Sequence, residues 1–246
     1  MNNKIFDKKQ LEELAKDGCA NGRRFSMLVS SEDLTGMVYG EIKVGDAIYI
    51  MQYNQPIMVS VVKEIIKDGK SVDMASDCNI KVILDINGEV KKDKFTVLTS
   101  IRPDTDEYIQ NAFLLGLSYG FYKYNGDMDY LGLLINQISK AKYLLPISLI
   151  KSNDDNLKEG SVFSIPSLVN PSNKEETVLP IYTDYVELSN YKSEMWQKAK
   201  VMLVTFEDAV TFSKKHDKGI VINPFGDAPI MLPEDLLNTI ISNMKK

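Results

Sequence analysis

Hydrophobic and polar positions alternate in short runs between Arg24 and about Ile101. Alternation with a period of two is typical of half-buried β-strands, and Gly or Asp-Gly signals separate the runs. Strands this short and this closely spaced predict a small antiparallel β-barrel or a sandwich. The predicted strands are FSMLVS, MVYGEI, AIYIMQ, IMVSVVKEII, NIKVILDI and FTVLTSI.

Two glycines in this region indicate where the backbone bends or turns. Gly40 stands inside a predicted strand, where glycine usually marks a bulge or the sharp bend that a small closed barrel needs at its corners. In IKVGD, residues 42–46, Gly45 can supply a positive φ for a turn. Asp46 can then hydrogen-bond the local backbone.

Residues 102–128 form a connector with a helical pattern. Apolar residues recur at helical spacing between Ile109 and Leu117, after Pro103 and an acidic stretch that both favour the start of a helix. Four aromatic residues follow, and they could stack on a ligand. Because aromatic rings dominate packing energetics, we expect them to pack the connector onto a domain instead. They are Tyr119, Phe121, Tyr122 and Tyr124.

Helices and strands alternate from Tyr130 onward. The segment YLGLLINQISKA has one apolar face, as amphipathic helices do. Thr205 and Asp208 resemble a capping box at a helix start, and Thr183 is a natural N-cap. Strand-helix-strand units with short crossovers imply a mixed sheet covered by helices. The predicted strands include YLLPISLI, SVFSIPSL, TVLPIY and AKVMLVT.

These patterns predict an α+β protein with two domains, since 246 residues exceed the usual size of a single hydrophobic core. Residues 1–101 are expected to hold a short amino-terminal helix and the small antiparallel β-barrel. Residues 102–128 are the helical connector. Residues 129–246 are expected to form a mixed α/β sheet covered by helices.

The stretch GIVINPFGDAPIMLPEDLL, residues 219–237, begins as a buried strand and stops at Asn-Pro-Phe-Gly. Turn chemistry explains each residue type. Pro224 cannot continue a ladder, Asn223 can accept the local backbone, and Gly226 can adopt a positive φ, with Phe225 folded back onto the core. The alternative is a binding loop, because loops at the carboxyl ends of sheet strands commonly bind ligands. These four residues are therefore the candidate site for a ligand or a partner.

Composition narrows the function classes. The net charge is −5 and neither half of the chain is basic, which disfavours nucleic-acid binding because phosphate contacts supply most of its affinity. We find no apolar run suited to a membrane span or a signal-peptide core, so a cytoplasmic protein is expected. Cys19 and Cys78 lack the spacing of a disulfide framework, a redox pair or a zinc site.

Matched catalytic sets are missing from the sequence. A phosphate-binding G-x-x-x-x-G-K-[ST] loop does not occur, and His216 is the one histidine, in the polar string SKKHDKG. The acid pairs Glu207-Asp208 and Glu234-Asp235 stand at predicted helix starts, where the helix dipole explains them. We therefore expect no catalytic residues, no metal site and no cofactor.

Two parts of the chain resemble known families. The segment TGMVYGEIKVGDAIYI, residues 35–50, followed by residues 61–86, resembles the second, β-barrel domain of translational GTPases such as elongation factor Tu. The resemblance implies a barrel, but the phosphate-binding loop of those enzymes is absent. DLTG and NKEE match fragments of GTPase motifs without their partners.

Residues 129–246 resemble the amino-terminal domain of the SseB family, named for enhanced serine sensitivity. The matching pieces are YLLPISL, VLPIYTD, LVTFEDA and GIVINPFG followed by LPEDLL. One departure is visible, because Tyr185 and Val186 stand where acidic residues are expected after Thr183-Asp184. The resemblance implies a small α/β binding or scaffold domain without enzyme chemistry.

Three function classes follow from these features. The first is a noncatalytic binding or scaffold protein that recognises a protein or a small ligand, with a protein as the favoured partner. The alternative is a translation-associated factor whose barrel contacts ribosomal RNA or tRNA through lysines, although nucleic acid is disfavoured by the charge. An enzyme is the third class. The lysines are Lys63, Lys67, Lys70 and Lys81.

Overall fold

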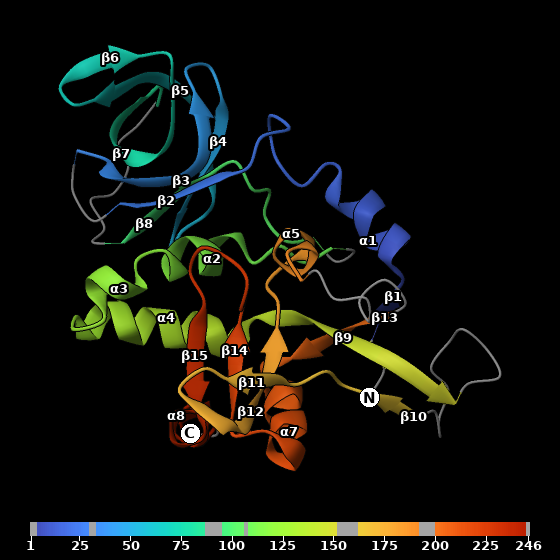
Figure 1. The fold of residues 1–246 in the computed structure, drawn as a ribbon. Helices are drawn as coiled ribbons and strands as arrows, with labels where there is room; N and C mark the ends of the chain where they lie inside the picture. Colours follow the sequence, from blue (N-terminus) through green and yellow to red (C-terminus); the bar gives the residue numbers. More distant parts are fainter. Residues whose placement is uncertain are drawn as a thin grey trace. The chain divides into compact units, whose positions relative to one another are not determined.

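The computed structural model describes residues 4–29, 33–86, 95–105, 108–151, 162–191 and 200–244 (Figure 1). The chain divides into two compact units, one of residues 16–134 and one that combines residues 1–15 with residues 135–246. The amino-terminal strand and helix thus join the carboxy-terminal part of the chain. The domain boundaries at 101 and 128 stay predictions, because compactness does not establish that a segment folds alone.

Seven strands build the unit of residues 16–134. Six of them follow one another in the order β4-β8-β2-β3-β7-β5, and β5 also pairs with β4, which closes an antiparallel barrel. The short β6 extends β5 as a hairpin. The predicted barrel is confirmed. The strands are β2 (Phe25–Val29), β3 (Thr35–Lys43), β4 (Ala47–Gln52), β5 (Met58–Lys67), β6 (Lys70–Val72), β7 (Met74–Leu84) and β8 (Thr96–Thr99).

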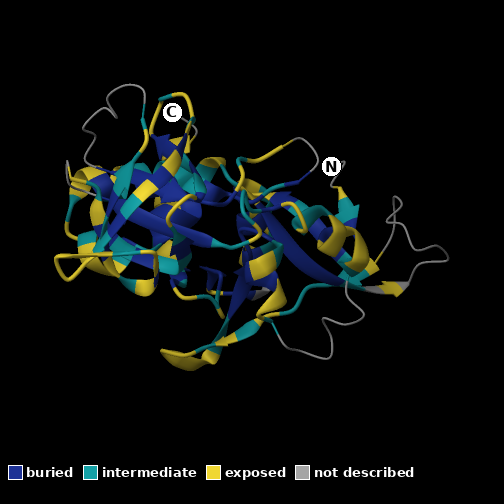
Figure 2. Cartoon of the chain, turned by 90° about the horizontal axis from the view of Figure 1, so that it is seen from above, coloured by how far each residue is buried: buried dark blue, intermediate teal, exposed yellow. Residues whose placement is uncertain are grey.

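Alternate side chains fill the barrel, which is why the sequence pattern has a period of two. In β5, Val62 is buried while Val59 and Val61 are exposed. The next buried apolar residue is Ile65, three positions later, because the register with β7 shifts between Val62 and Glu64. In Figure 2 the strands carry buried residues interspersed with intermediate and exposed ones.

Gly40 lies at the predicted bulge. The register of β3 against β7 shifts between Val38 and Glu41, so two residues of β3 oppose Asp77 alone. Gly40 has a φ of 89°, and a Cβ there would collide with the carbonyl oxygen of Arg24. The Asp77 carboxylate accepts a hydrogen bond of 2.8 Å from the Gly40 N–H.

The turn between β3 and β4 has the predicted chemistry. Gly45 has a φ of 88°, and Asp46 Oδ2 accepts a hydrogen bond of 2.8 Å from the Lys43 N–H. Asp46 is buried, and its other carboxylate oxygen is paired with the Arg23 guanidinium. The turn prediction is confirmed, and the ion pair adds a contact that the sequence did not indicate.

The connector begins its helices later than expected. Asp104 does not lie in a helical turn: its Oδ1 accepts from the backbone N–H groups of Gln110 and Asn111, at 2.5 and 2.7 Å, and the first helix begins at Ala112. Tyr119 packs as expected within the unit, stacked on Tyr39 with ring centroids 4.0 Å apart, whereas Tyr122 is 70% exposed and does not. The helices are α2 (Ala112–Ser118), α3 (Phe121–Tyr124) and α4 (Met128–Lys140).

The described part of the other unit has two sheets where one was expected, and the second is mixed, as expected. The first has the order β1-β13-β9-β10 and is antiparallel throughout. The second has the order β11-β12-β14-β15, in which β12 and β14 run parallel. The strands are β1 (Ile5–Phe6), β9 (Lys142–Lys151), β10 (Val162–Ser164), β11 (Leu168–Asn170), β12 (Asn173–Ile181), β13 (Lys200–Thr205), β14 (Gly219–Ile222) and β15 (Ile230–Pro233).

Helix starts in this unit follow capping rules with one correction. Thr205 and Asp208 form the predicted capping box. Thr183 is not an N-cap, because Asp184 caps the next helix with its own carboxylate. Among the described residues, the structure has no helix with both the length and the apolar character for a membrane span. The helices are α1 (Lys8–Ala15), α5 (Tyr185–Ser189), α7 (Phe206–His216) and α8 (Glu234–Met244).

Candidate functional site

Parallel pairing of β12 and β14 brings their carboxyl ends to the same edge of the second sheet. The predicted loop follows β14 there. The Asn223 N–H donates to the Ile181 carbonyl at 2.9 Å, and the Gly226 N–H donates to the Asn223 carbonyl at 3.0 Å. The loop is therefore a hydrogen-bonded turn that starts directly at the end of the ladder.

Asn223 fixes this turn to the segment after β12. Its side chain is buried, and its Oδ1 accepts a hydrogen bond of 2.9 Å from the Thr183 N–H. Its Nδ2 donates to Thr183 Oγ1 at 2.9 Å. Two loops that are distant in sequence are thus held together by one amide side chain, which we call the Asn223 clamp.

The positive φ in the turn belongs to Asn223, at 50°, and not to Gly226 as expected. Asparagine tolerates the left-handed region because its short polar side chain can form local hydrogen bonds. Gly226 is small for another reason. A Cβ at this position would collide with the carboxylate of Glu187, which is itself buried.

Asp184 connects the clamp to α5. The Asp184 carboxylate is fully buried, and its Oδ1 accepts from the N–H groups of Val186 and Glu187 at 2.8 and 3.2 Å. Its Oδ2 lies 3.0 Å from Thr183 Oγ1. The first turn of α5 is therefore fixed in place relative to the turn at Asn223.

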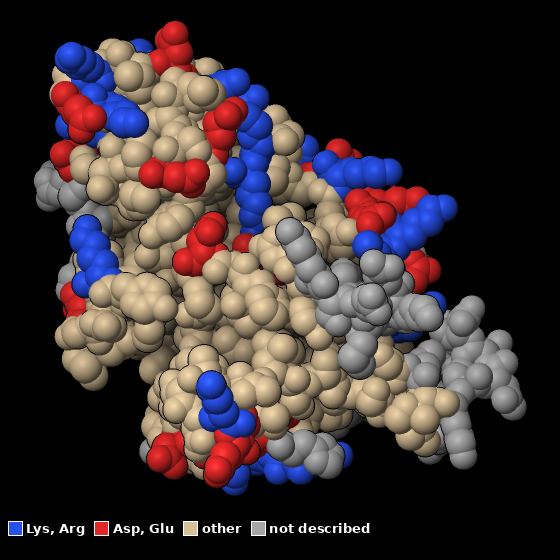
Figure 3. All heavy atoms as spheres, in the orientation of Figure 1, with Lys and Arg blue, Asp and Glu red and all other residues tan. Residues whose placement is uncertain are grey.

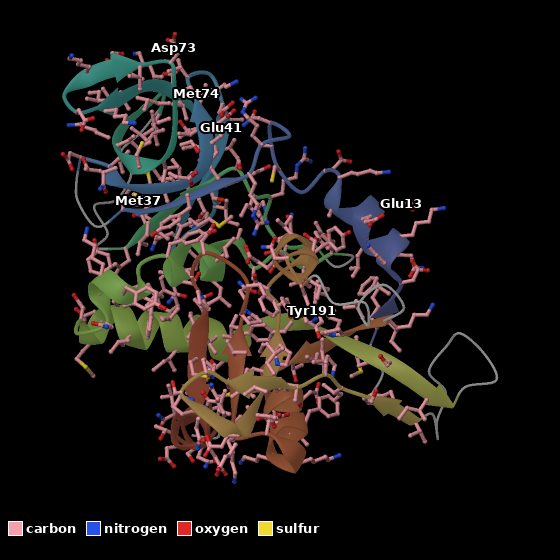
Figure 4. All side chains as sticks on the ribbon, viewed as in Figure 1. Glu13, Met37, Glu41, Asp73, Met74 and Tyr191 are labelled. Carbon is pink, nitrogen blue, oxygen red and sulfur yellow. The ribbon has the colours of Figure 1, made fainter. Side chains whose placement is uncertain are left out.

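Phe225 does not fold back onto the core, so that expectation is wrong. Its side chain is 46% exposed, and its ring stacks on Tyr191 with centroids 5.4 Å apart and planes 8° apart. Tyr191 lies two residues beyond the end of α5 (Figure 4). Together, Tyr191, Pro224 and Phe225 form what we call the Phe225 surface. It presents a supported aromatic ring to solvent.

Two tyrosines next to this surface stay protonated at neutral pH. Burial raises the pKa of Tyr182 far above its usual range. Burial, together with a hydrogen bond to Glu12, raises the pKa of Tyr185 to about 12. The Tyr185 hydroxyl donates to Glu12 Oε1 at 2.9 Å and so connects α5 to α1. The Tyr182 hydroxyl, in contrast, is buried without a hydrogen-bond partner among the described residues.

The remaining sequence candidates lie elsewhere in the two units. Glu207 and Asp208 occupy the first turn of α7, and Glu234 opens α8 and pairs with Lys218 at 3.6 Å. His216 is the last residue of α7. Among the residues that the structure describes, no group of three His, Cys, Asp or Glu side chains is arranged to hold a metal ion.

The four barrel lysines comprise three exposed residues and one that forms an ion pair. Lys67 and Lys70 are exposed and directly opposite each other on β5 and β6, and Lys63 is exposed on β5. Lys81 pairs with Asp33 at 3.7 Å. The barrel face seen in Figure 3 intersperses Lys and Arg with Asp and Glu side chains.

Sequence reasoning missed Tyr191, Asp184 and Glu187 as parts of the site. Asp184 carried a signal, because Asp before a helix start is a common N-cap. Tyr191 carried none, since its approach to Phe225 depends on how the chain continues after α5. The four predicted loop residues lie together but have different roles, with Asn223 and Gly226 supporting Phe225.

A family model and a solved structure are similar to this chain. Residues 128–239 match the family model of the SseB protein N-terminal domain. No curated protein sequence matches the chain. Among solved structures, translation elongation factor SelB from Methanococcus maripaludis, apo form, is similar at 13% identity and a TM-score of 0.26. The match covers 74% of this chain and 36% of that chain, and a TM-score this low supports no argument about function.

Proposed function

We propose that this protein, whose residues 128–239 match the SseB N-terminal domain, is a noncatalytic binding protein that recognises a partner protein through the Phe225 surface. One observation carries the proposal. Phe225 is 46% exposed, although the Asn223 clamp fixes its turn and Tyr191 supports its ring. An aromatic side chain held rigidly in solvent is suited to insertion into a partner's pocket.

The energetics favour binding at this position. Ordering a mobile side chain on association costs about 0.5–1.5 kcal/mol, and a residue that is already fixed avoids much of that cost. Aromatic residues are enriched at the centres of protein–protein interfaces, where a few of them supply most of the affinity. A partner protein is therefore the occupant that the chemistry of the Phe225 surface supports best.

Two acidic groups, one beside the turn and one at the start of α7, have capping roles that support a noncatalytic function. Asp184 is occupied as the cap of α5, and Asp208 is occupied in the capping box of α7. A general acid or base must be able to exchange a proton with a substrate, whereas these two carboxylates accept hydrogen bonds from the backbone at the start of a helix. These side chains thus serve the fold.

The proposal is tested with two full-length variants. Phe225→Ser removes the exposed ring, and Val169→Thr changes a side chain that is 60% exposed on β11 and serves as the matched control. We expect a partner that copurifies with the wild type and with Val169→Thr to be lost with Phe225→Ser. With that partner purified, the dissociation constant should rise about 10- to 100-fold. Equal retention by all three proteins would count against the proposal.

A second function is supported by one observation on the barrel. Lys67 and Lys70 are directly opposite in the β5–β6 hairpin, and like charges in this position repel each other. Bound phosphate groups would offset this repulsion, as expected of a translation-associated factor. We expect Lys67→Gln with Lys70→Gln to abolish ribosome co-sedimentation at low salt, if that function holds. Failure of the wild type to co-sediment would eliminate it.

A further inference from the structure

A pocket of about 410 Å³ lies in the unit of residues 1–15 and 135–246, lined by side chains of β10, β12 and α7 and of the segments after β10 and α7. Its volume is within the range of small-molecule sites and far above the roughly 30 Å³ of one water molecule. The lining residues are Phe163, Ser164, Ile165, Ser167, Leu179, Phe212, Lys215 and Asp217. None of them belongs to the Phe225 surface.

Asp217 is the exceptional residue of this pocket. Its side chain is only 9% exposed, and its Oδ1 is buried without a hydrogen-bond donor among the described residues. A buried carboxylate oxygen is normally paired, because leaving it unpaired costs stability. The position adds to this cost. Asp217 is the C-cap of α7, where the negative end of the helix dipole opposes a carboxylate.

The backbone fixes Asp217 in this unfavourable position. Its N–H donates to the Ser213 carbonyl at 2.8 Å, while Ser213 Oγ donates to the Gly219 carbonyl at 2.9 Å. Asp217 therefore lines the pocket because of the course of the chain from α7 into β14. Lys215, which could have neutralised it, makes no ion pair within 4.0 Å among the described residues.

Aromatic rings form the apolar wall of the same pocket. Phe163 and Phe212 meet edge to face, with centroids 6.2 Å apart and planes 82° apart. Leu179 and Ile165 extend this wall. A ring face attracts an organic cation, and its apolar surroundings favour a ligand with a hydrocarbon body. A single carboxylate beside phenyl rings is a poor site for Ca²⁺ or Mg²⁺, which require six or more oxygen ligands.

We propose that this pocket binds a small organic ammonium compound, whose ammonium group donates to Asp217 and whose apolar body packs against Phe163 and Phe212. The ammonium group neutralises the negative charge at the helix end. A primary amine and a zwitterionic amino acid share this chemistry. They differ in a carboxylate, which the Lys215 ammonium at the same pocket would accept.

The experiment is isothermal titration of the full-length protein with phenethylamine, phenylalanine and 3-phenylpropionate. We expect the two ammonium compounds to bind and phenylpropionate, which has no ammonium group, not to bind. Asp217→Asn should weaken the binding at least tenfold, while Asp227→Asn, which changes an exposed acid outside the pocket, should leave it unchanged. Tighter binding of phenylalanine that is lost in Lys215→Gln would identify a zwitterion as the ligand class.

A second readout separates a binding role from a structural one. If Asp217 is retained for the ligand, Asp217→Asn removes an unpaired buried charge, and the melting temperature of the ligand-free protein should stay equal or rise. A lower melting temperature would assign Asp217 to the fold and overturn the proposal. So would equal binding by wild type and Asp217→Asn, or the absence of heat with both ammonium compounds.

Discussion

Asn223 combines two properties at one position, a left-handed backbone and a buried amide that binds Thr183 across 40 residues of sequence. Glycine would satisfy the first property and not the second. The residue therefore decides both the shape of the turn and its attachment to the segment after β12.

Two variants separate these properties. Asn223→Gly keeps the allowed φ but leaves the Thr183 N–H unpaired, which should cost about 1–3 kcal/mol of unfolding free energy. Asn223→Ala adds the strain of a left-handed residue and should cost about 2–5 kcal/mol. Urea unfolding of both variants measures the difference. Equal losses would show that the backbone strain is negligible.

Asp77 makes stability depend on pH. The hydrogen bond from the Gly40 N–H, helped by Ser76, lowers the pKa of the Asp77 carboxyl below its usual 3.8. A lowered folded-state pKa stabilises the protein above the unfolded-state pKa, and this contribution is lost as the pH falls through the folded-state value. We expect the wild type to melt above Asp77→Asn at pH 6 and the gap to narrow below about pH 4. A gap that is constant from pH 6 to pH 2 would contradict this account.

Sequence patterns predicted the turn at residues 223–226 but not which residue carries the strain. Asn and Gly both tolerate a positive φ, so local chemistry left the choice open. The hydrogen bond from the Thr183 N–H to the Asn223 side chain favours Asn at this position, and Thr183 is remote in sequence. Likewise, the position of Phe225 depends on Tyr191. Long-range contacts of this kind have no periodic signal.

At the scale of elements, the β3 bulge and the β3–β4 turn provide a matched pair. Gly40 and Gly45 have nearly the same φ, 89° and 88°, but only Gly40 has backbone atoms within 4 Å of an added Cβ. Gly40→Ala and Gly45→Ala therefore share the conformational cost, and Gly40→Ala adds a collision with Arg24. We expect Gly40→Ala to lower the unfolding free energy by several kcal/mol more, measured in urea. Similar losses would mean that the bulge can open without cost.

Periodicity predicted the types of the elements, but it did not predict where α2 and α5 begin. The pattern predicted the barrel strands because alternate residues enter the core, such as Phe25, Met27 and Val29 of β2. The start of α2 was displaced because Asp104 bonds to the backbone of a loop instead of a helical turn. Asp184 took the capping role expected of Thr183 because Thr183 was already engaged by Asn223. In both cases side-chain hydrogen bonds outside the helix decide where the helix begins.

At the scale of the whole molecule, the change from a period of two to alternating helices and strands predicted a barrel followed by a mixed α/β sheet. It could not predict that residues 1–15 join the carboxy-terminal part, since β1 pairs with β13. The proposed function belongs to this scale because a partner must recognise a surface assembled from the segment after α5 and the β14–β15 turn.

Photo-crosslinking is the most direct test of that function. Phe225 and, as the control, the exposed Val169 are each replaced by p-benzoyl-phenylalanine in the full-length protein, which is irradiated in native extract. We predict that position 225 captures a discrete protein that position 169 does not capture. Asn223→Ala in the same chain should weaken the capture, because the clamp no longer fixes the turn. Identical crosslinks from both positions, or none from position 225, would contradict the account.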